Sequence, residues 1–224
     1  ACDKIIAKGK KVAAKMLEGK PEDIDFKGGE FILKNSNKKK TIGEIAFACY
    51  LPGTFGDVKS PLPEGVEPGL IETSFFDPSN FSFPSGTHIC EAEVDEETGE
   101  TNVVKYTVVD DFGTIINPLV VEGQVYGGVA QGVGQALYEN AHYDESGQLT
   151  SASYMDYTMP RADNFPQIKL DYTCTPATSN PLGAKGCGEA GTIAAPAAVM
   201  NAVIDAVGTD VSMPATAEKV WKAL

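Results

Sequence analysis

The sequence has little arginine and histidine, no closely spaced cysteine pair and no long apolar run. Arg161 is the single arginine, and 31 acidic residues against 18 basic ones give a formal net charge of −13. Such a surface repels nucleic acid and anionic membranes, because contacts to phosphate groups drive that kind of binding. With one arginine, a site for a phosphorylated ligand would depend on backbone N–H groups or on another chain. We therefore expect neither nucleic acid nor a membrane as a partner.

The five cysteines are odd in number and widely spaced, and none forms a CxxC pair. This spacing argues against a zinc knuckle or a four-cysteine iron–sulfur site, so we expect no metal held by protein side chains. We interpret the cysteines as reduced thiols of a cytoplasmic protein. No apolar run approaches the roughly 20 residues that span a bilayer, and no signal peptide is visible. A helix is expected almost from Ala1, which suggests an excised piece or a processed subunit.

The order of the expected elements favours an α+β fold, because strands and helices are mixed without a regular βαβ rhythm. Apolar periodicity predicts helices at residues 2–18, 41–51, 120–140 and 196–207, and a last one from about Thr216. Pro196 suits a first helical position and Gly208 a helix end. We expect a hairpin at 24–34, a hairpin of strands 88–94 and 103–109, a hairpin around 144–147, and a strand at 167–174.

Residues 52–86 divide the chain into two parts. This stretch is rich in proline, glycine and serine and carries Phe75, Phe76, Phe81 and Phe83. Loops of that length are usually functional or hold subunits together. We predict an N-terminal part, 1–85, with a helix and this long loop, and a C-terminal part, 86–224, with the chemical motifs. The lysine groups Lys8–Lys15 and Lys38–Lys40 are interpreted as solvated faces.

Five glycines interrupt the helix expected at 120–140, at positions 123, 127, 128, 132 and 134. Each glycine inside a helix costs about 1 kcal/mol relative to alanine, so the cluster needs a reason. Either a backbone or a flat ligand approaches this face closely, or the helix packs tightly against another helix. Spacing alone leaves both explanations open. Gln124, Gln131 and Gln135 add amides that both donate and accept hydrogen bonds.

A second glycine-rich segment, residues 181–191, contains a GxGxxG match from Gly186 to Gly191. A dinucleotide fingerprint is disfavoured, because residues 175–185 do not resemble a strand and Glu189 would repel a pyrophosphate. A carboxylate between glycines near a helix start suits a general base that faces a ligand. The alternative is an acid that only satisfies backbone N–H groups at the helix entrance. Cys187 is interpreted as a small buried thiol, and His88 and His142 as packed or surface residues.

These segments and their neighbours resemble the molybdenum hydroxylase family, which includes xanthine dehydrogenase, aldehyde oxidoreductase, aerobic carbon monoxide dehydrogenase and N-heterocycle dehydrogenases. The resemblance is an ordered series, dense over residues 80–224 and loose before them. It comprises Gly86-Thr-His88, Glu93-Val-Asp95, Thr98-Gly99, Asp110-Asp-Phe-Gly113, Ile116-Asn-Pro118, Glu122-Gly-Gln124, Gln131-Gly-Val-Gly134, Ala136-Leu-Tyr-Glu139, Asp156-Tyr157, Met159-Pro160, Lys185-Gly-Cys-Gly-Glu-Ala-Gly191, Asn201-Ala202, Asp205-Ala206 and the tail from Pro214 to Leu224.

The resemblance implies a molybdopterin cofactor whose metal is held by the pterin dithiolene. It implies the mixed α+β fold of the C-terminal molybdopterin-binding domain. Glu189 matches the family glutamate that takes a proton from a metal-bound hydroxyl while that oxygen, derived from water, attacks a substrate carbon. Gln131, Gly132 and Gly134 match the segment that lies against the pterin, and Gly186 and Gly188 shape the approach to the metal. Cys187 departs from the family, in which a small aliphatic residue is common.

The family large subunit is several times longer than this chain, so the resemblance implies a fragment of an oxidoreductase that acts on an aldehyde or an N-heteroaromatic carbon. It implies as partners the remaining N-terminal part of the subunit, iron–sulfur and FAD subunits or domains, and a small-molecule substrate. The cytosine dinucleotide form of molybdopterin is one candidate cofactor. Two alternatives are a non-catalytic assembly domain of the same fold and a nucleotide-binding protein.

Overall fold

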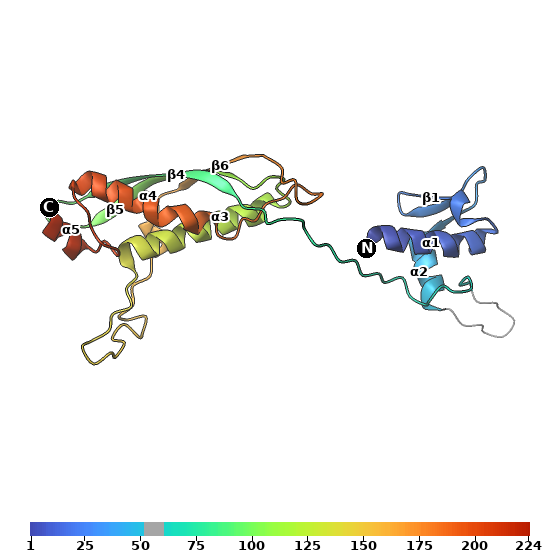
Figure 1. Ribbon diagram of the computed structural model, residues 1–224, viewed down its shortest axis with the longest axis horizontal. Coiled ribbons are helices and arrows are strands. Elements are labelled where there is room, and N and C mark those ends of the chain that lie inside the picture. Colours follow the sequence, from blue (N-terminus) through green and yellow to red (C-terminus); the bar gives the residue numbers. More distant parts are fainter. Residues whose placement is uncertain (52–60) are drawn as a thin grey trace. The chain divides into compact units, whose positions relative to one another are not determined.

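The computed structural model describes residues 1–51 and 61–224, which form two compact units, Ala1–Asp77 and Pro78–Leu224 (Figure 1). Part of the loop expected at 52–86, residues 52–60, lies outside the described residues. Residues 61–84 of that loop contain neither helix nor strand. The division expected between residues 85 and 86 stays a prediction, and each unit is described by itself.

The first unit packs two helices against a three-stranded antiparallel sheet. Its elements are α1 (Cys2–Leu17), the short 3-10 turn η1 (Pro21–Asp23), β1 (Ile24–Lys27), β2 (Glu30–Leu33), β3 (Lys39–Thr41) and α2 (Ile42–Tyr50). The predicted helices and hairpin are confirmed. The sequence analysis missed β3, because its lysines resemble a solvated face; lysine is typical of a sheet edge, and β3 is an edge strand.

Two lysines of α1 contact the segment that follows residue 60, although Lys15, like Lys11, is exposed as expected of a solvated face. The Lys15 Nζ donates a hydrogen bond of 2.6 Å to the Leu62 carbonyl oxygen. The Lys8 Nζ lies 3.8 Å from the Glu72 carboxylate, and both side chains are largely buried. Long lysine side chains cover apolar surface with their stems while the charged ends reach these partners.

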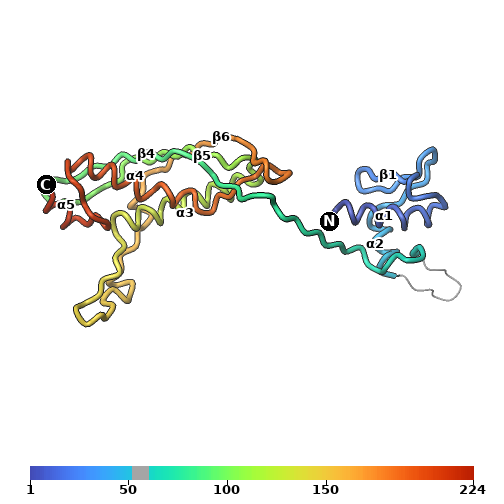
Figure 2. Tube along the Cα trace, in the orientation of Figure 1, coloured from blue at the N-terminus to red at the C-terminus, as the bar shows by residue number. Residues whose placement is uncertain are grey.

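The second unit is a mixed three-stranded sheet with two long helices that lie side by side (Figures 1 and 2). Antiparallel strands β4 (Ser85–Val94) and β5 (Thr101–Asp111) form the long hairpin, and β6 (Ile168–Thr173) pairs with β5 in parallel. The helices α3 (Pro118–Val133) and α4 (Ala190–Val207) share one core with β5. The fold is therefore α+β, as predicted.

Shorter elements complete this unit. A π-helical turn, η2 (Gly134–Tyr138), continues α3, a 3-10 turn, η3 (Ala162–Asn164), precedes β6, and α5 (Ala217–Ala223) ends the chain. Asn117 caps α3 and Pro118 occupies its first turn, although the sequence analysis interpreted these residues as the end of the preceding unit. The hairpin expected around 144–147 is a turn with a single bridge between Tyr143 and Leu149.

The two long helices approach each other through glycines. A Cβ placed on Gly128 would lie 2.8 Å from the Gly191 Cα, and one placed on Gly132 would lie 2.4 Å from the Ala195 Cβ. The later residue of α3 contacts the later residue of α4 in these two pairs, so the helices run parallel. Of the two explanations left open for the glycine cluster, tight helix packing accounts for Gly128 and Gly132.

The start of α4 differs from the prediction. The helix begins at Ala190, and Pro196 lies inside it rather than at its first position. Pro196 removes one backbone hydrogen bond, but Gly191 and Ala195 pack against α3 on the N-terminal side of it. The local signal for a helix start is therefore overridden by packing, and Glu189 becomes the N-cap residue of α4.

By length and composition α4 is the one described helix that could cross a membrane, with a mean hydropathy of 1.5. Six of its residues, among them Val199, Met200 and Val203, are buried inside the unit. A core helix that packs against both another helix and a sheet reaches such a composition without any membrane.

The loop before α4 is fastened to the end of β5. The Lys185 N–H donates to the Phe112 carbonyl oxygen at 2.9 Å, and the Lys185 Nζ lies 3.0 Å from the Asp111 Oδ1. Gly113 has a φ of +59°, and a Cβ at this position would lie 2.1 Å from the Gly183 carbonyl oxygen. Glycine is thus required where the two segments meet.

Asp111 is the polar centre of this junction and is 5% exposed. Hydrogen bonds from the Thr175 side chain and the Gly113 N–H, together with Lys185, hold the pKa of the Asp111 carboxyl well below its ordinary value of 3.8. The ionised form of Asp111 therefore stabilises the folded state.

We expect Gly132→Ala to destabilise the second unit and Gly127→Ala to leave it unchanged or slightly more stable. The added methyl group at residue 132 meets Ala195, an overpacking that costs about 1–3 kcal/mol. No atom lies within 4 Å of a Cβ at Gly127, so helix propensity there adds up to about 1 kcal/mol. Chemical denaturation followed by the fluorescence of Trp221, the only tryptophan, measures both changes. Equal midpoints would contradict the packing role.

We expect Asp111→Asn to lower the unfolding midpoint of the second unit at pH 7. Folding lowers the pKa of Asp111, so its contribution is complete above the ordinary value of 3.8 and is lost as the pH falls below it. The gap between wild type and variant, measured by Trp221 fluorescence, should shrink between about pH 4 and pH 2. Asp210→Asn, at an exposed position, is the matched control. A gap that widens in acid would refute this assignment.

Candidate functional site

Glu189 is presented at the N-terminus of α4 with its side chain exposed. Its backbone has φ −105° and ψ −8°, and its carbonyl oxygen accepts the N–H groups of Thr192 and Ile193, each at 3.0 Å. The Glu189 carboxylate makes no capping hydrogen bond. The alternative in which this acid only satisfies backbone N–H groups is therefore not the arrangement observed, and the carboxylate is available to a ligand.

The glycines before Glu189 leave open space beside it. A Cβ at Gly186 would have the Ser82 carbonyl oxygen at 3.8 Å as its nearest neighbour, and one at Gly188 would have the Gln124 Oε1 at 4.0 Å. Both glycines are exposed. A flat ligand could therefore approach the backbone next to the Glu189 carboxylate without meeting a side chain.

The three residues expected to lie against the pterin have different surroundings. Gln131 is exposed on α3, whereas Gly132 and Gly134 are buried. The Cβ direction of Gly132 faces Ala195, and that of Gly134 faces the Glu139 carboxylate. Packing explains both of these glycines, and a cofactor contact at the three positions stays a prediction.

Gln124, one of the three amides noted in the sequence, is the α3 amide that lies next to the Gly188–Glu189 turn, a position that the sequence did not predict. The parallel register of the helices explains why: Gly128 faces Gly191, so Gln124, one turn earlier, faces Gly188. The only signal in the sequence is that Gln124 precedes Gly128 by four residues, one helical turn. This spacing indicates a neighbour for Gln124 only once the pairing of α3 with α4 is known.

The exposed surface of α3 near Glu189 is mainly apolar, and the one charged residue of this helix, Glu122, is half-buried. Leu119 is 78% exposed, Val120 54% and Tyr126 40%, and Ile193 of α4 is 68% exposed. Gly123 and Gly127 also lie on this surface, and no atom lies within 4 Å of the position of a Cβ on either. A mainly apolar face of this kind, on a chain with a net charge of −13, is typical of a surface that another part of a protein covers.

The tyrosine at position 172 has an unsatisfied hydroxyl group behind this surface. Among the described residues its oxygen is buried and has no hydrogen-bond partner. Burial, followed by the charges of Glu122 and other neighbours, raises the pKa of Tyr172 to about 12. The hydroxyl therefore keeps its proton at neutral pH. Cys187 is half-buried against the same core, as expected for a small packed thiol.

A buried cluster of three polar side chains links strand β4 to strand β5. The His88 Nδ1 lies 2.9 Å from the Tyr106 hydroxyl, and its Nε2 lies 3.5 Å from the Asp110 Oδ1. The side chains of His88 and Asp110 are 2% and 3% exposed. A Cβ at Gly86 would collide with the Asp110 carboxylate. The packed role predicted for His88 is confirmed, while His142 is exposed and contacts Thr150.

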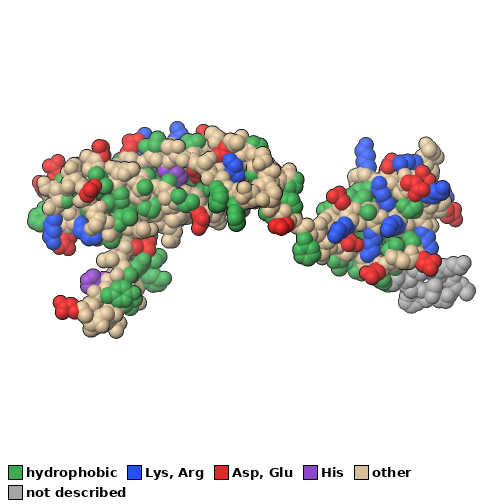
Figure 3. Space-filling view, viewed as in Figure 1, with side chains coloured by type: hydrophobic (Ala, Val, Ile, Leu, Met, Phe, Trp, Pro, Cys, Tyr) green, Lys and Arg blue, Asp and Glu red, His purple; other side chains and the backbone are tan. Residues whose placement is uncertain are grey.

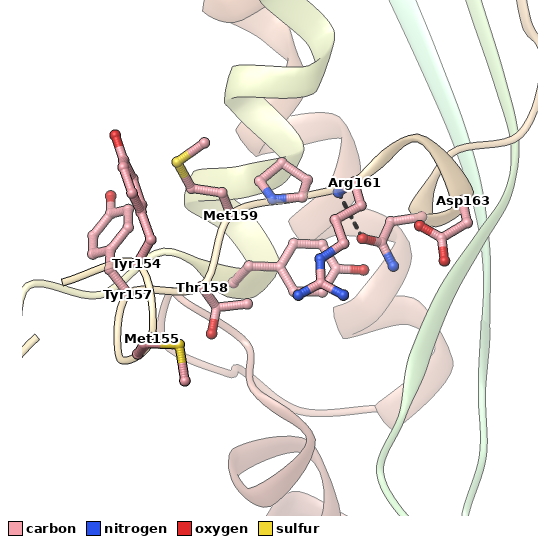
Figure 4. Close-up of a pocket in the computed structure, with 10 residues that line it drawn as sticks. Tyr154, Met155, Tyr157, Thr158, Met159, Arg161 and Asp163 are labelled. Atoms are coloured by element: carbon pink, nitrogen blue, oxygen red, sulfur yellow. Dashed lines mark hydrogen bonds between the residues drawn. The ribbon is translucent and has the colours of Figure 1, made fainter.

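A separate hollow of about 570 Å³ lies at the base of the arm formed by residues 139–161. Figure 4 shows its wall, which includes Tyr157, Met159 and Arg161, and a hydrogen bond of 2.8 Å from the Arg161 N–H to Asn164. Tyr138 also lines it, 14 residues along the helix from Gln124, which places it roughly 20 Å from the Glu189 end of α3. Figure 3 shows hydrophobic side chains along the arm. This hollow is therefore distinct from the surroundings of Glu189.

Within residues 1–51 and 61–224, no group of three or more histidine, cysteine, aspartate or glutamate side chains could hold a metal ion. The chemical groups near Glu189 are its carboxylate, the Gln124 amide and open backbone. These groups fit a cofactor that brings its own metal ligands.

The sequence matches the family of the molybdopterin cofactor-binding domain over residues 1–166. It is 38% identical over 229 residues to the carbon monoxide dehydrogenase large chain of Hydrogenophaga pseudoflava, covering 100% of this chain and 27% of that one. It is 41% identical over 217 residues to the nicotine 6-hydroxylase large subunit of Paenarthrobacter nicotinovorans, covering 95% of this chain and 26% of that one. The family therefore includes the first unit, where the resemblance had been loose.

Solved structures give the same result. A Cu,Mo-CO dehydrogenase matches with a TM-score of 0.82 at 36% identity, and quinoline 2-oxidoreductase from Pseudomonas putida 86 with 0.81 at 34%. Each match covers 100% of this chain and 28% of the other. The chain spans about a quarter of the length of the curated relatives. The chain belongs to the molybdopterin cofactor-binding domain family.

Proposed function

We propose that this chain forms the proton-accepting wall of a molybdenum hydroxylase active site, with Glu189 as the catalytic base. The observation that supports this role is the exposed, uncapped carboxylate at the N-terminus of α4, beside the open Gly186 and Gly188. The Glu189 segment lies beyond the residues matched by the family, 1–166, but within the full-length match to the carbon monoxide dehydrogenase chain.

The residues near Glu189 fit a molybdopterin cofactor, since the space beside Gly188 is open and Gln124 offers an amide to the polar edge of a pterin. Molybdopterin, when bound, supplies the redox chemistry that removes two electrons from the substrate. Glu189 accepts the proton from the attacking oxygen, which comes from water, and so raises its nucleophilicity. Gly186 and Gly188 leave room for the approach of the substrate carbon. The cytosine dinucleotide form is one candidate for this cofactor.

The substrate is proposed to be an aldehyde or an N-heteroaromatic compound that is oxidised at carbon. Nicotine and quinoline, in the names of two matched proteins, are N-heteroaromatic, whereas carbon monoxide, in the name of another, is not. The choice depends on residues outside this chain.

The proposed partners are the remaining part of the same large subunit and iron–sulfur and flavin subunits or domains that accept the electrons. The mainly apolar surface around Leu119, Tyr126 and Ile193 adjoins the Glu189 end of the helices and suits contact with that remaining part. We expect the isolated, cofactor-free chain to have no activity, and we expect the complete enzyme to be cytoplasmic.

A non-catalytic assembly domain of the same fold is the second candidate function. The exposed Glu189 disfavours it, because an assembly domain has no need for a free carboxylate beside two open glycines. Nucleotide binding is disfavoured further, because β6 ends at Thr173 and no strand leads directly into α4.

We expect Glu189→Gln in the complete enzyme to lower kcat by about 10²–10⁴-fold, because glutamine keeps the shape of glutamate but accepts no proton. Molybdenum and pterin content should stay at the wild-type level. Steady-state kinetics with metal analysis of the same preparation measures both quantities.

The control for this variant is Glu97→Gln, at an exposed position in the turn between β4 and β5. It should leave kcat and cofactor content unchanged. Wild-type turnover by Glu189→Gln with the cofactor bound would exclude the catalytic role and favour the assembly domain.

A further inference from the structure

Glu189 lies on a short span between two fixed points. Before it, the backbone of Lys185 is bonded to Phe112 at 2.9 Å. After it, Ala190 is 7% exposed, and the Thr192 hydroxyl donates to the Gly128 carbonyl oxygen of α3 at 3.1 Å. Four residues, 186–189, lie between Lys185 and Ala190, and two of them are glycines. Glycine adopts many backbone conformations, so the span itself does not fix the direction of the Glu189 carboxylate. That direction therefore depends on how firmly the two ends of the span are held.

The end after Glu189 is held by helix packing. Gly191 lies so close to α3 that a Cβ there would be 2.4 Å from the Val125 carbonyl oxygen. The end before Glu189 is held by one ion pair in addition to its backbone bonds. The Lys185 ammonium and the Asp111 carboxylate are 3.0 Å apart, and their side chains are 13% and 7% exposed. An ion pair this buried is screened little by solvent, so it restricts the position of Lys185 strongly.

We propose that Lys185 and Asp111 are a positioning pair that holds the Glu189 carboxylate in the direction needed for proton transfer. This inference rests on the proposed catalytic role of Glu189. Lys185 itself does not reach the reacting atoms, because its ammonium group is turned toward the end of β5. Removal of the Lys185 charge leaves Asp111 bonded to the Gly113 N–H at 2.8 Å, so the end of β5 keeps its structure while the loop loses its tether.

The test compares Lys185→Met, Asp111→Asn and their double variant in the complete, cofactor-loaded enzyme. We expect Lys185→Met to lower kcat about tenfold or more at unchanged KM and unchanged molybdenum and pterin content, because small misplacements of a catalytic group are costly. In the Asp111→Asn background, Lys185→Met should cause no further loss, since the pair is already broken. Independent, additive losses would overturn the proposal, as would a loss that merely follows the cofactor content.

The matched control is Lys105→Met, which breaks the Lys105–Glu91 pair of the same sheet. That pair is 2.6 Å long but more than half exposed, so its loss should change neither kcat nor loop structure. An effect of Lys105→Met equal to that of Lys185→Met would overturn the proposal.

Hydrogen exchange gives a readout that does not depend on turnover. Residues 183–193 should exchange faster in Lys185→Met than in wild type, while the β4–β5 hairpin exchanges at the same rate. Unchanged exchange in 183–193 would overturn the proposal even if Asp111→Asn fails to fold. Glu189→Gln, measured beside these variants, separates the two hypotheses. Full activity of Glu189→Gln refutes the catalytic base, whereas loss of activity there with a fully active Lys185→Met refutes only the positioning pair.

Discussion

The backbones of α3 and α4 meet through glycines with no side chain between them, and the place of Glu189 depends on this contact. Gly191 rests against the Val125 carbonyl oxygen and Gly128, so the first turn of α4 is pressed onto α3. That contact extends the helix back beyond Pro196 to Ala190 and makes Glu189 its N-cap. A larger residue at position 128 or 191 would separate the helices and move the carboxylate. The glycine cost of about 1 kcal/mol per residue in helix propensity is offset by this packing.

A second contact, between the end of β5 and the loop before α4, completes the frame. Asp111 and Gly113 lie within the motif Asp110-Asp-Phe-Gly113, which by itself resembles a turn. In the fold, Asp111 receives Lys185, and Gly113 accommodates the Gly183 carbonyl oxygen. Two motifs separated by about 70 residues thus form one structure. The Glu189 segment is held at both ends while its own surface stays open.

The exposed face of α3, on the side away from the core, also bears on the function of the site. The exposed face of α3 is mainly apolar, with Glu122 half-buried as its one charged residue, although the chain as a whole is strongly acidic. Leu119 and Tyr126 would be poorly placed on a surface that always faces water. This chain spans 27% of a related large chain. Under the proposed function, the remaining part of the subunit would cover this face and supply the other walls of the site.

Sequence patterns determined most of the local structure, because apolar periodicity and turn residues act over a few positions. They predicted α1, α2, the β4–β5 hairpin and β6, and the ordered motifs indicated the family and Glu189. They failed where distant segments decide: at β3, an edge strand of lysines, at the start of α4 and in the position of Gln124 beside Gly188. Only the tertiary structure assigned Gly128 and Gly132 to helix packing and left Gly186 and Gly188 open. The physical reason is that a glycine looks the same in sequence whether a helix or open space lies beside it.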